Sequence, residues 1–315
     1  MQSEGTPSSG LASSGVLEVE GEGNGYEPLT DGAAERGAFK LVGGYILDGK
    51  VQNEVELRAM SGDEEDMLGN GSIPVVMRMN SIMSACTQRI GDIPGSDAAM
   101  IQKAIRGMPS GTRTHLLICL RVVSHYKTEK DKYEMEATCP HCKHPVQCHV
   151  LLSELEKYDW EAGHASMEYD FTLPYSEVDV TWRVMTSDQD AVVSELSRLN
   201  DSISLSVSIA MRLVKFDGED CALSRDDLLD SRGKKMKLSR RGRHVMDIVR
   251  KMQTGDRDAL RAQFLDNEPG IETTVTVDCS NDACGREFEV GLDVSQPGFF
   301  FPQATSMLSK RKRTT

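Results

Sequence analysis

Two stretches of the chain alternate apolar and polar residues, and a pair of cysteines interrupts each of them. Alternation of this kind is typical of a half-buried β-strand, because successive side chains point to opposite faces of a sheet. The first stretch alternates over residues 133–139 and again over 146–152. The second alternates over 275–279 and 288–292. The pattern therefore predicts two units, each made of a strand, a cysteine-bearing turn and a second strand.

The rest of the hydrophobic pattern predicts helices and further hairpins around these units. Asp48-Gly49 predicts a hairpin turn within residues 39–60, and Ser61 followed by Glu64 is the signature of a helix start. Further helices are expected over 74–90, after 109–111 and from 187, and a strand pair over 167–173 and 178–184. Residues 203–215 alternate as a strand would but also permit a helix, so both remain open.

The two cysteine pairs, Cys139 with Cys142 and Cys279 with Cys284, together offer four soft ligands. Four thiolates on two hairpin tips are what a tetrahedral Zn²⁺ site needs. Such a site has no open position for water, so the metal would be structural. We therefore predict an α+β protein in which helices flank a split, zinc-ribbon-like antiparallel β unit.

Two other interpretations of the cysteines are considered. The four could be free thiols in a reducing compartment, where disulfides are rare. A local site could instead complete the first pair with His144, Cys148 or His149, but it would leave the second pair unexplained and ranks below the shared site. His115 and Cys119 lie in the pattern of a packed helix and are not expected to bind metal.

Composition and charge limit the possible functions. The net charge of −13 argues against a general nucleic-acid binder, because neutralisation of phosphates dominates such binding. Eight cysteines without a signal peptide indicate a protein made in a cytoplasm, and no stretch approaches the roughly 20 apolar residues of a membrane span. The sequence also lacks a phosphate-binding glycine loop, a nucleophile elbow and a zinc-protease helix motif, so we do not expect an enzyme.

The expected organisation is an arm, a body and a tail. Residues 1–37 are rich in Gly, Ser and Glu and are predicted to be a flexible acidic arm, and residues 304–315 a basic tail. The body, 38–303, is expected to comprise a hairpin with helices (38–130), a β unit with the first cysteine pair (131–185), a mainly helical part with a basic run at 232–243 (186–267), and the second cysteine hairpin (268–303). Phe299, Phe300 and Phe301 are expected on a final strand, with at least one exposed.

Several short motifs occur in an order that resembles a known family. They are Glu54-Val-Glu-Leu-Arg-Ala-Met-Ser-Gly-Asp-Glu-Glu-Asp-Met67, Leu152-Ser-Glu-Leu155 after the first cysteine pair, Leu173-Pro174, and Gly298-Phe-Phe-Phe-Pro302 after the second pair. Over residues 38–303 this order resembles the baseplate proteins of contractile-tailed bacteriophages, a family related to the baseplate hub assembly protein of T-even phages. Two departures are Lys143, where Gly is usual, and four residues instead of two within the second pair.

The resemblance implies a non-enzymatic structural or assembly role in a viral tail baseplate. It implies a hetero-oligomer with other baseplate and tail hub proteins, assembled in the host cytoplasm and located in the virion, and leaves open whether the protein stays in the mature virion or acts only in assembly. The composition argues against membrane and nucleic-acid partners. The alternative is a zinc-ribbon module that binds nucleic acid, which the basic run favours and the overall acidity opposes.

Overall fold

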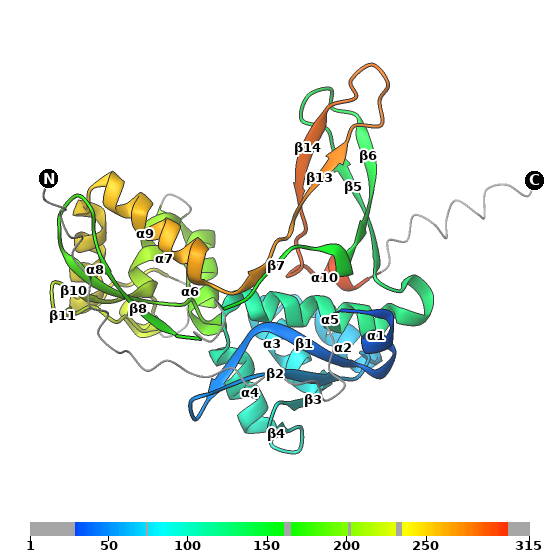
Figure 1. Ribbon diagram of the computed structural model, residues 1–315, viewed down its shortest axis with the longest axis horizontal. Coiled ribbons are helices and arrows are strands. Elements are labelled where there is room, and N and C mark those ends of the chain that lie inside the picture. Colours follow the sequence, from blue (N-terminus) through cyan, green and yellow to red (C-terminus); the bar gives the residue numbers. More distant parts are fainter. Residues whose placement is uncertain (1–28, 74, 161–164, 201–202, 231–234, 302–315) are drawn as a thin grey trace, which may run out of the picture.

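The chain folds into two lobes and a projecting pair of hairpins (Figure 1). The computed structural model describes residues 29–73, 75–160, 165–200, 203–230 and 235–301. It combines α-helices with antiparallel sheets, which confirms the predicted α+β class. Buried apolar side chains form two separate clusters. We call residues 29–158 and 270–301 the first lobe, and residues 160–268 the second lobe.

The first lobe packs helices against a four-stranded sheet of order β1-β2-β3-β4. The strands are β1 (Ala38–Leu47), β2 (Lys50–Leu57), β3 (Thr87–Ile90) and β4 (Ile93–Pro94). The helices are α1 (Asp31–Arg36), α2 (Gly62–Gly69), α3 (Val75–Cys86), α4 (Ala98–Gly107) and α5 (Ser110–Glu129). Asp48 and Gly49 have positive φ and form the predicted turn, and Ser61 with Glu64 forms the predicted capping box. The helix expected over 74–90 ends at Cys86, and β3 follows because residues 87–90 pair with β2.

Residues 29–37, the end of the predicted acidic arm, have a fixed structure. Leu29, Ala33 and Ala34 are buried in the first lobe, and the Thr30 side chain accepts a hydrogen bond from the Ala33 N–H. Gly37, with φ of 70°, ends α1. The expectation of an arm without fixed structure is therefore wrong for residues 29–37, where apolar contacts with the core order the chain. Residues 1–28 lie outside the described part of the chain, as do residues 302–315, which include the predicted tail.

The second lobe packs four helices against a sheet of order β11-β10-β9-β8. The strands are β8 (Glu168–Thr172), β9 (Asp179–Arg183), β10 (Leu213–Phe216) and β11 (Glu219–Asp220). The helices are α6 (Ser187–Leu199), α7 (Ser204–Arg212), α8 (Arg240–Lys251) and α9 (Thr254–Asn267), with a short 3₁₀ turn at Arg225–Asp227. A further 3₁₀ turn, Leu152–Glu154, belongs to the first lobe. The stretch that the sequence left open is thus a helix followed by a strand. Three adjacent residues of α7, from Ile209 to Met211, are all buried, which a half-buried strand would not allow.

The second lobe is an insertion into the first. The chain leaves the first lobe at β7 (Lys157–Tyr158) and returns at β12 (Gly270–Ile271), and these two strands pair antiparallel with Tyr158 opposite Gly270. The segment 131–185, expected to form one β unit, consequently spans both lobes. Its first hairpin belongs to the first lobe, and β8 with β9 belongs to the second.

A bulge in β1 fixes the junction between the lobes. Gly43 and Gly44 have φ of 72° and 92°, and at Gly43 a Cβ atom would lie 2.4 Å from the Thr112 hydroxyl. The Gly43 N–H donates to Asp159 at 2.8 Å, and the Trp160 ring N–H donates to the Gly43 carbonyl at 2.9 Å. Glycine is needed here because another residue would be strained and would collide with α5.

His115, on α5, accepts a hydrogen bond at Nδ1 from the Val42 N–H of this bulge, at 3.1 Å. The ring is buried, and burial lowers its pKa to about 4, with a smaller contribution from the charge of Lys157. His115 and the buried Cys119 are thus packed helix residues, as predicted, and belong to no metal-ligand cluster in the described chain.

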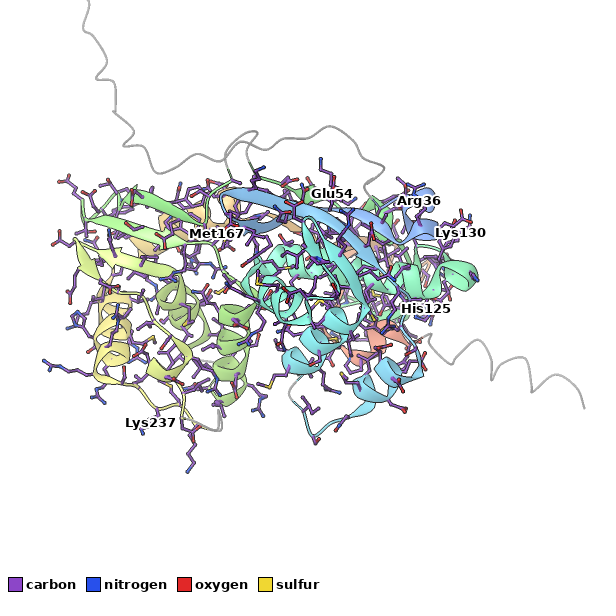
Figure 2. All side chains as sticks on the ribbon, turned by 90° about the horizontal axis from the view of Figure 1, so that it is seen from below. Arg36, Glu54, His125, Lys130, Met167 and Lys237 are labelled. Atoms are coloured by element: carbon purple, nitrogen blue, oxygen red, sulfur yellow. The ribbon has the colours of Figure 1, made fainter. Side chains whose placement is uncertain are left out.

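The C-terminal aromatic residues form a helical turn, α10 (Pro297–Phe300), so the expectation of a strand is wrong there. Proline at the first helical position favours this outcome. Phe299 and Phe300 are buried, whereas Phe301 is 36% exposed, in line with the expectation that at least one stays accessible. Arg121 contacts the Phe299 carbonyl and stacks on its ring, and His125 Nε2 lies 2.8 Å from the Phe300 carbonyl. Figure 2 shows His125 beside this turn, at the opposite end of the molecule from Lys237.

The neutral state of His115 should make stability depend on pH. Its pKa in the folded protein, about 4, lies below the ordinary value of 6.5, so the unfolded chain binds more protons between these values. Stability should therefore be greatest above pH 6.5 and fall as the pH drops towards 4. We expect His115→Gln, whose side-chain oxygen can still accept from Val42, to reduce that loss by up to about 3 kcal/mol in denaturant titrations. The exposed His149→Gln is the control, and equal pH dependence in all three proteins would contradict the assignment.

Alanine substitution should separate the three phenylalanines. Phe299→Ala and Phe300→Ala should each lower the free energy of unfolding by ~3–5 kcal/mol, because they remove buried rings. Phe301→Ala should change it by less than about 1 kcal/mol, as is usual for surface positions. Thermal or urea unfolding measures all three, and a large loss at Phe301 would mean that its ring is part of the core.

Candidate metal centre

Two hairpins project side by side from the first lobe and carry the predicted cysteines at their tips (Figure 1). The first is β5 (Lys132–Thr138) with β6 (Pro145–Leu151), and the second is β13 (Thr274–Asp278) with β14 (Glu287–Gly291). We call residues 132–151 and 274–291 together the finger. The hairpins form separate two-stranded sheets, so no strand ladder joins them.

Apolar side chains on one face of each hairpin belong to the same hydrophobic cluster as the core of the first lobe and extend it into the finger. The burial of β6 alternates along its whole length, as the sequence pattern predicts. The packed residues are Tyr133, Met135, Ala137, Val146, Cys148, Val150, Val275, Val277, Phe288 and Val290. Acidic side chains occupy much of the other face, among them Glu134, Glu136, Glu287 and Glu289. The hairpins thus depend on side-chain contacts to stay together.

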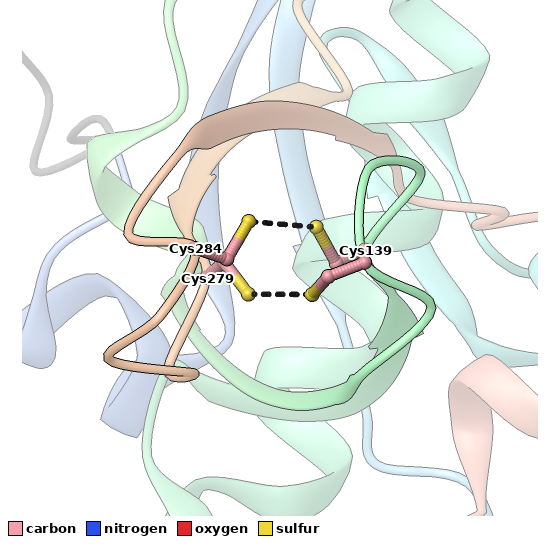
Figure 3. A group of neighbouring side chains, drawn as sticks. Cys139, Cys279 and Cys284 are labelled. Atoms are coloured by element: carbon pink, nitrogen blue, oxygen red, sulfur yellow. Dashed lines mark hydrogen bonds between the residues drawn. The ribbon is translucent and has the colours of Figure 1, made fainter.

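The four predicted cysteines come together although they are far apart in the sequence. Their Sγ atoms all lie within 4.8 Å of one another. Figure 3 shows the two cross-hairpin contacts, Cys139 to Cys284 at 4.0 Å and Cys142 to Cys279 at 3.5 Å. A disulfide needs about 2.05 Å, so all four are free thiols. Four thiolates around one tetrahedral ion, at about 2.3 Å from it, lie about 3.8 Å apart. The cluster therefore fits a metal ion.

The structure does not bring His144, Cys148 or His149 into a site with the first cysteine pair. The cluster contains none of His144, Cys148 or His149. Cys148 is buried on the packed face of β6, and its Sγ lies 3.7 Å from the Val146 carbonyl. His149 is exposed and lies 3.5 Å from Glu134. Among the described residues, the second hairpin supplies the missing ligands.

The first cysteine turn is closed by backbone hydrogen bonds. The Cys139 N–H donates to the His144 carbonyl, and the Lys143 N–H donates to the Cys139 carbonyl, both at 2.9 Å. Lys143 has φ of 62°, the left-handed conformation in which glycine is usual. The turn therefore accommodates a lysine in the left-handed conformation.

The second turn reaches the same geometry with a longer loop. The Cys279 N–H donates to the Arg286 carbonyl at 3.0 Å, and Gly285, with φ of 54°, takes the left-handed position. The Asn281 carbonyl accepts from the N–H groups of Cys284 and Gly285, at 2.8 and 3.0 Å, which folds the additional residues into a compact turn. The Asn281 side chain also donates to Cys142 Sγ of the other hairpin at 3.8 Å. Sequence analysis missed Asn281, although an asparagine two residues after a turn cysteine is a recognisable turn signal.

The electrostatics of the cluster favour at least one thiolate. Burial raises the pKa of Cys139, but N–H groups of Cys142 and His141 that point at its sulfur offset this effect and lower the pKa to about 7. At Cys279 the Asn281 N–H lowers the pKa, while burial and the three neighbouring thiols raise it to about 12. Without an ion, the neighbouring thiols stabilise the thiolate of Cys139 but oppose the ionisation of Cys279. A divalent cation would remove this conflict, because thiolates are the metal-binding form.

The other thiols of the chain are of a different kind. Cys86 and Cys221 are buried, and burial raises their pKa to about 12 and about 11. Such thiols are inert packing residues at neutral pH. His244 pairs with Glu219 at 3.1 Å, and His164 lies outside the described residues. Within the described residues, the four-cysteine cluster is thus the group that offers metal-binding chemistry.

Two further findings bear on the setting of this centre. None of the described helices is long and apolar enough to cross a membrane. No family model, characterised protein or solved structure matches the chain, so its function is inferred from the site and the sequence.

Proposed function

We propose that the protein is a non-enzymatic structural or assembly component of a contractile-tailed phage baseplate, with a structural Zn²⁺ in the four-cysteine cluster. The observation that carries the proposal is that the two hairpins contribute two thiols each to one closed site. All four positions around a tetrahedral zinc would be filled by protein, so the metal would hold the chain together.

The role of the zinc would be to fix the finger. Isolated two-stranded hairpins are only marginally stable in water, and these two share no ladder hydrogen bonds. Cys139 and Cys142 precede the inserted lobe, whereas Cys279 and Cys284 follow it. The metal would therefore join the chain on both sides of the insertion into one split, zinc-ribbon-like unit.

The finger suits a protein that works through contacts with other subunits. It projects from the first lobe, and its outer surface is polar. The order of motifs from Glu54 to Pro302 supplies the setting, because it resembles phage baseplate proteins. We infer that the partners are other baseplate and tail hub proteins in a hetero-oligomeric assembly, formed in the host cytoplasm and located in the virion.

One observation keeps a second function in view. The helix α8 and the segment before it carry exposed lysines and arginines, as a nucleic-acid-binding module would. These residues lie in the second lobe, however, and the metal centre lies at the tip of the finger on the first. A zinc-ribbon nucleic-acid module is therefore the second candidate.

The metal proposal predicts one zinc per chain. Structural zinc contributes an apparent 10–16 kcal/mol in small finger peptides at neutral pH, roughly as much as the stability of a whole domain. We expect Cys279→Ser to lower zinc content to near zero and to unfold the finger. Elemental analysis and amide exchange over residues 132–151 and 274–291 measure these two effects. Cys148→Ala is the matched control in the same hairpin and should keep the zinc; full zinc content in Cys279→Ser would exclude the shared site.

The baseplate proposal predicts an assembly defect. Phage that lack the protein should accumulate heads and tail proteins without completed, attached baseplates, visible by electron microscopy. Wild-type protein and Cys148→Ala supplied in trans should restore infectious particles, whereas Cys279→Ser should not. Normal tails without the protein would contradict the proposal, and tight DNA binding that weakens steeply with salt would favour the nucleic-acid module.

A further inference from the structure

The outer face of the second finger hairpin carries negative charge that the protein does not neutralise. Asp278, Glu287 and Glu289 are exposed there, and Asp278 lies directly opposite Glu287 in the pairing of β13 with β14. Within the described part of the chain, none of these three carboxylates has an ion-pair or side-chain hydrogen-bond partner. Like charges directly opposite each other destabilise a pair of strands. A cation placed on this face would therefore stabilise the hairpin.

The end of the chain contains cations with a matching spacing. Residues 310–313 are Lys-Arg-Lys-Arg, and residues 302–315 contain no acidic residue. We call residues 310–313 the basic run. In an extended backbone its two lysines point to the same side, about 7 Å apart, which is also the spacing of Glu287 and Glu289 along β14. The run and the face therefore match in the sign and the spacing of their charges.

The segment that carries the basic run starts at the base of the finger. Figure 1 shows α10 at this base, and the helix begins only six positions after the last residue of β14. The Phe299 ring contacts Tyr133 of the first hairpin, with the ring centroids 5.1 Å apart. Phe301, the last described residue, is 36% exposed, so the chain reaches the surface there. Residues 302–315 therefore begin beside the strands of the finger.

The segment is also long enough to reach the acidic face. Two consecutive backbone turns, over 293–296 and 296–299, each hold their first and fourth Cα atoms within about 7 Å of each other. Glu289 and Phe301 are therefore at most about 35 Å apart. Lys312 lies 11 positions beyond Phe301 and can extend up to roughly 36–40 Å from it. The basic run can thus reach Glu289 even at this upper limit of the distance.

Other acidic groups of the first lobe already have compensating charge. Asp63 and Glu65 lie in the first turn of α2, where the partial positive charge of the helix N-terminus stabilises carboxylates. On the first hairpin, Glu134 pairs with Lys132 at 2.9 Å. The three carboxylates of the second hairpin have neither kind of compensation, so they gain most from a cationic ligand.

We propose that the basic run docks on the outer face of the second hairpin of its own chain. The covalent tether replaces a bimolecular encounter by a millimolar effective concentration, which makes a few weak exposed ion pairs sufficient. The docked run would cover part of the polar surface of the finger. Under the proposed function, on which this last step rests, a neighbouring subunit with a basic surface would have to displace the run, which would thus control access to the finger.

Carbodiimide coupling in the full-length protein tests the proposal, because it joins carboxylates to amines that are in direct contact. At low salt we expect links from Lys310 or Lys312 to Glu287 or Glu289, identified by mass spectrometry and removed by 1 M NaCl. A segment that only moves about its anchor would link at least as often to the exposed Asp293, which is nearer to it along the chain.

The variant Asp278→Asn leaves both coupling glutamates in place. We expect it to lower the yield of their links about two- to fivefold, because it removes one exposed ion pair with the basic run. Asp66→Asn is the matched control, since it changes the net charge equally at an exposed position of α2 and should leave the yield unchanged.

Four results would overturn the proposal. Links mainly to Asp293 would show that the segment does not dock, and links mainly to Asp63 or Glu65 would place the run on α2. Isotope-mixed samples in which every link joins two chains would make a second copy the ligand. Equal yields in Asp278→Asn and the wild type would show that the charge of this face does not hold the run. None of these results concerns zinc content or baseplate assembly, so the docking can fail while the proposed function stands.

Discussion

The finger depends on holding together two hairpins that share no backbone hydrogen bonds. Each hairpin is only two strands wide, so each leaves two edges without a ladder partner. Apolar side chains join them along their length, and the cysteine cluster joins them at the tips. At the base, Arg121 lies against the rings of Tyr133 and Phe299, which links the first hairpin to the C-terminal turn. Each of these contacts favours the associated hairpins over separated ones, so the tip cluster and the base stabilise the same state.

The insertion explains how distant cysteines can meet at small entropic cost. Cys142 and Cys279 are 137 positions apart, and closing a flexible loop of that length would cost roughly 4 kcal/mol more than closing a minimal one. The pairing of β7 with β12 offsets much of this entropic cost, because it already brings Tyr158 and Gly270 opposite each other. Between this pair and the cysteines only short segments remain to be ordered. The second lobe is therefore inserted between the hairpins without separating the four cysteines.

The sequence predicted those parts of the structure that depend on local pattern. The strands of the finger, the capped helix after Ser61 and the four thiols follow from alternation, capping chemistry and cysteine spacing. The insertion could not be foreseen, since the pairing of β7 with β12 joins two strands of two residues each, too short to show any periodicity. Residues 29–36 and 297–300 were misassigned for a related reason. Their structure comes from contacts with the core of the first lobe, which the local sequence does not reveal. From the sequence alone, residues 29–36 look like part of a tail and residues 297–300 like part of a strand.

The antiparallel pairing of the entry and exit strands of the second lobe has a consequence for how such a protein can change over time. Because Tyr158 and Gly270 lie opposite each other, the chain enters and leaves the lobe at one place. During evolution, a lobe inserted in this way can be lengthened, shortened or replaced while the strands on either side keep their register. The finger and its thiols would then stay the same among related proteins. The second lobe, with its charged outer helix, would be the part that varies.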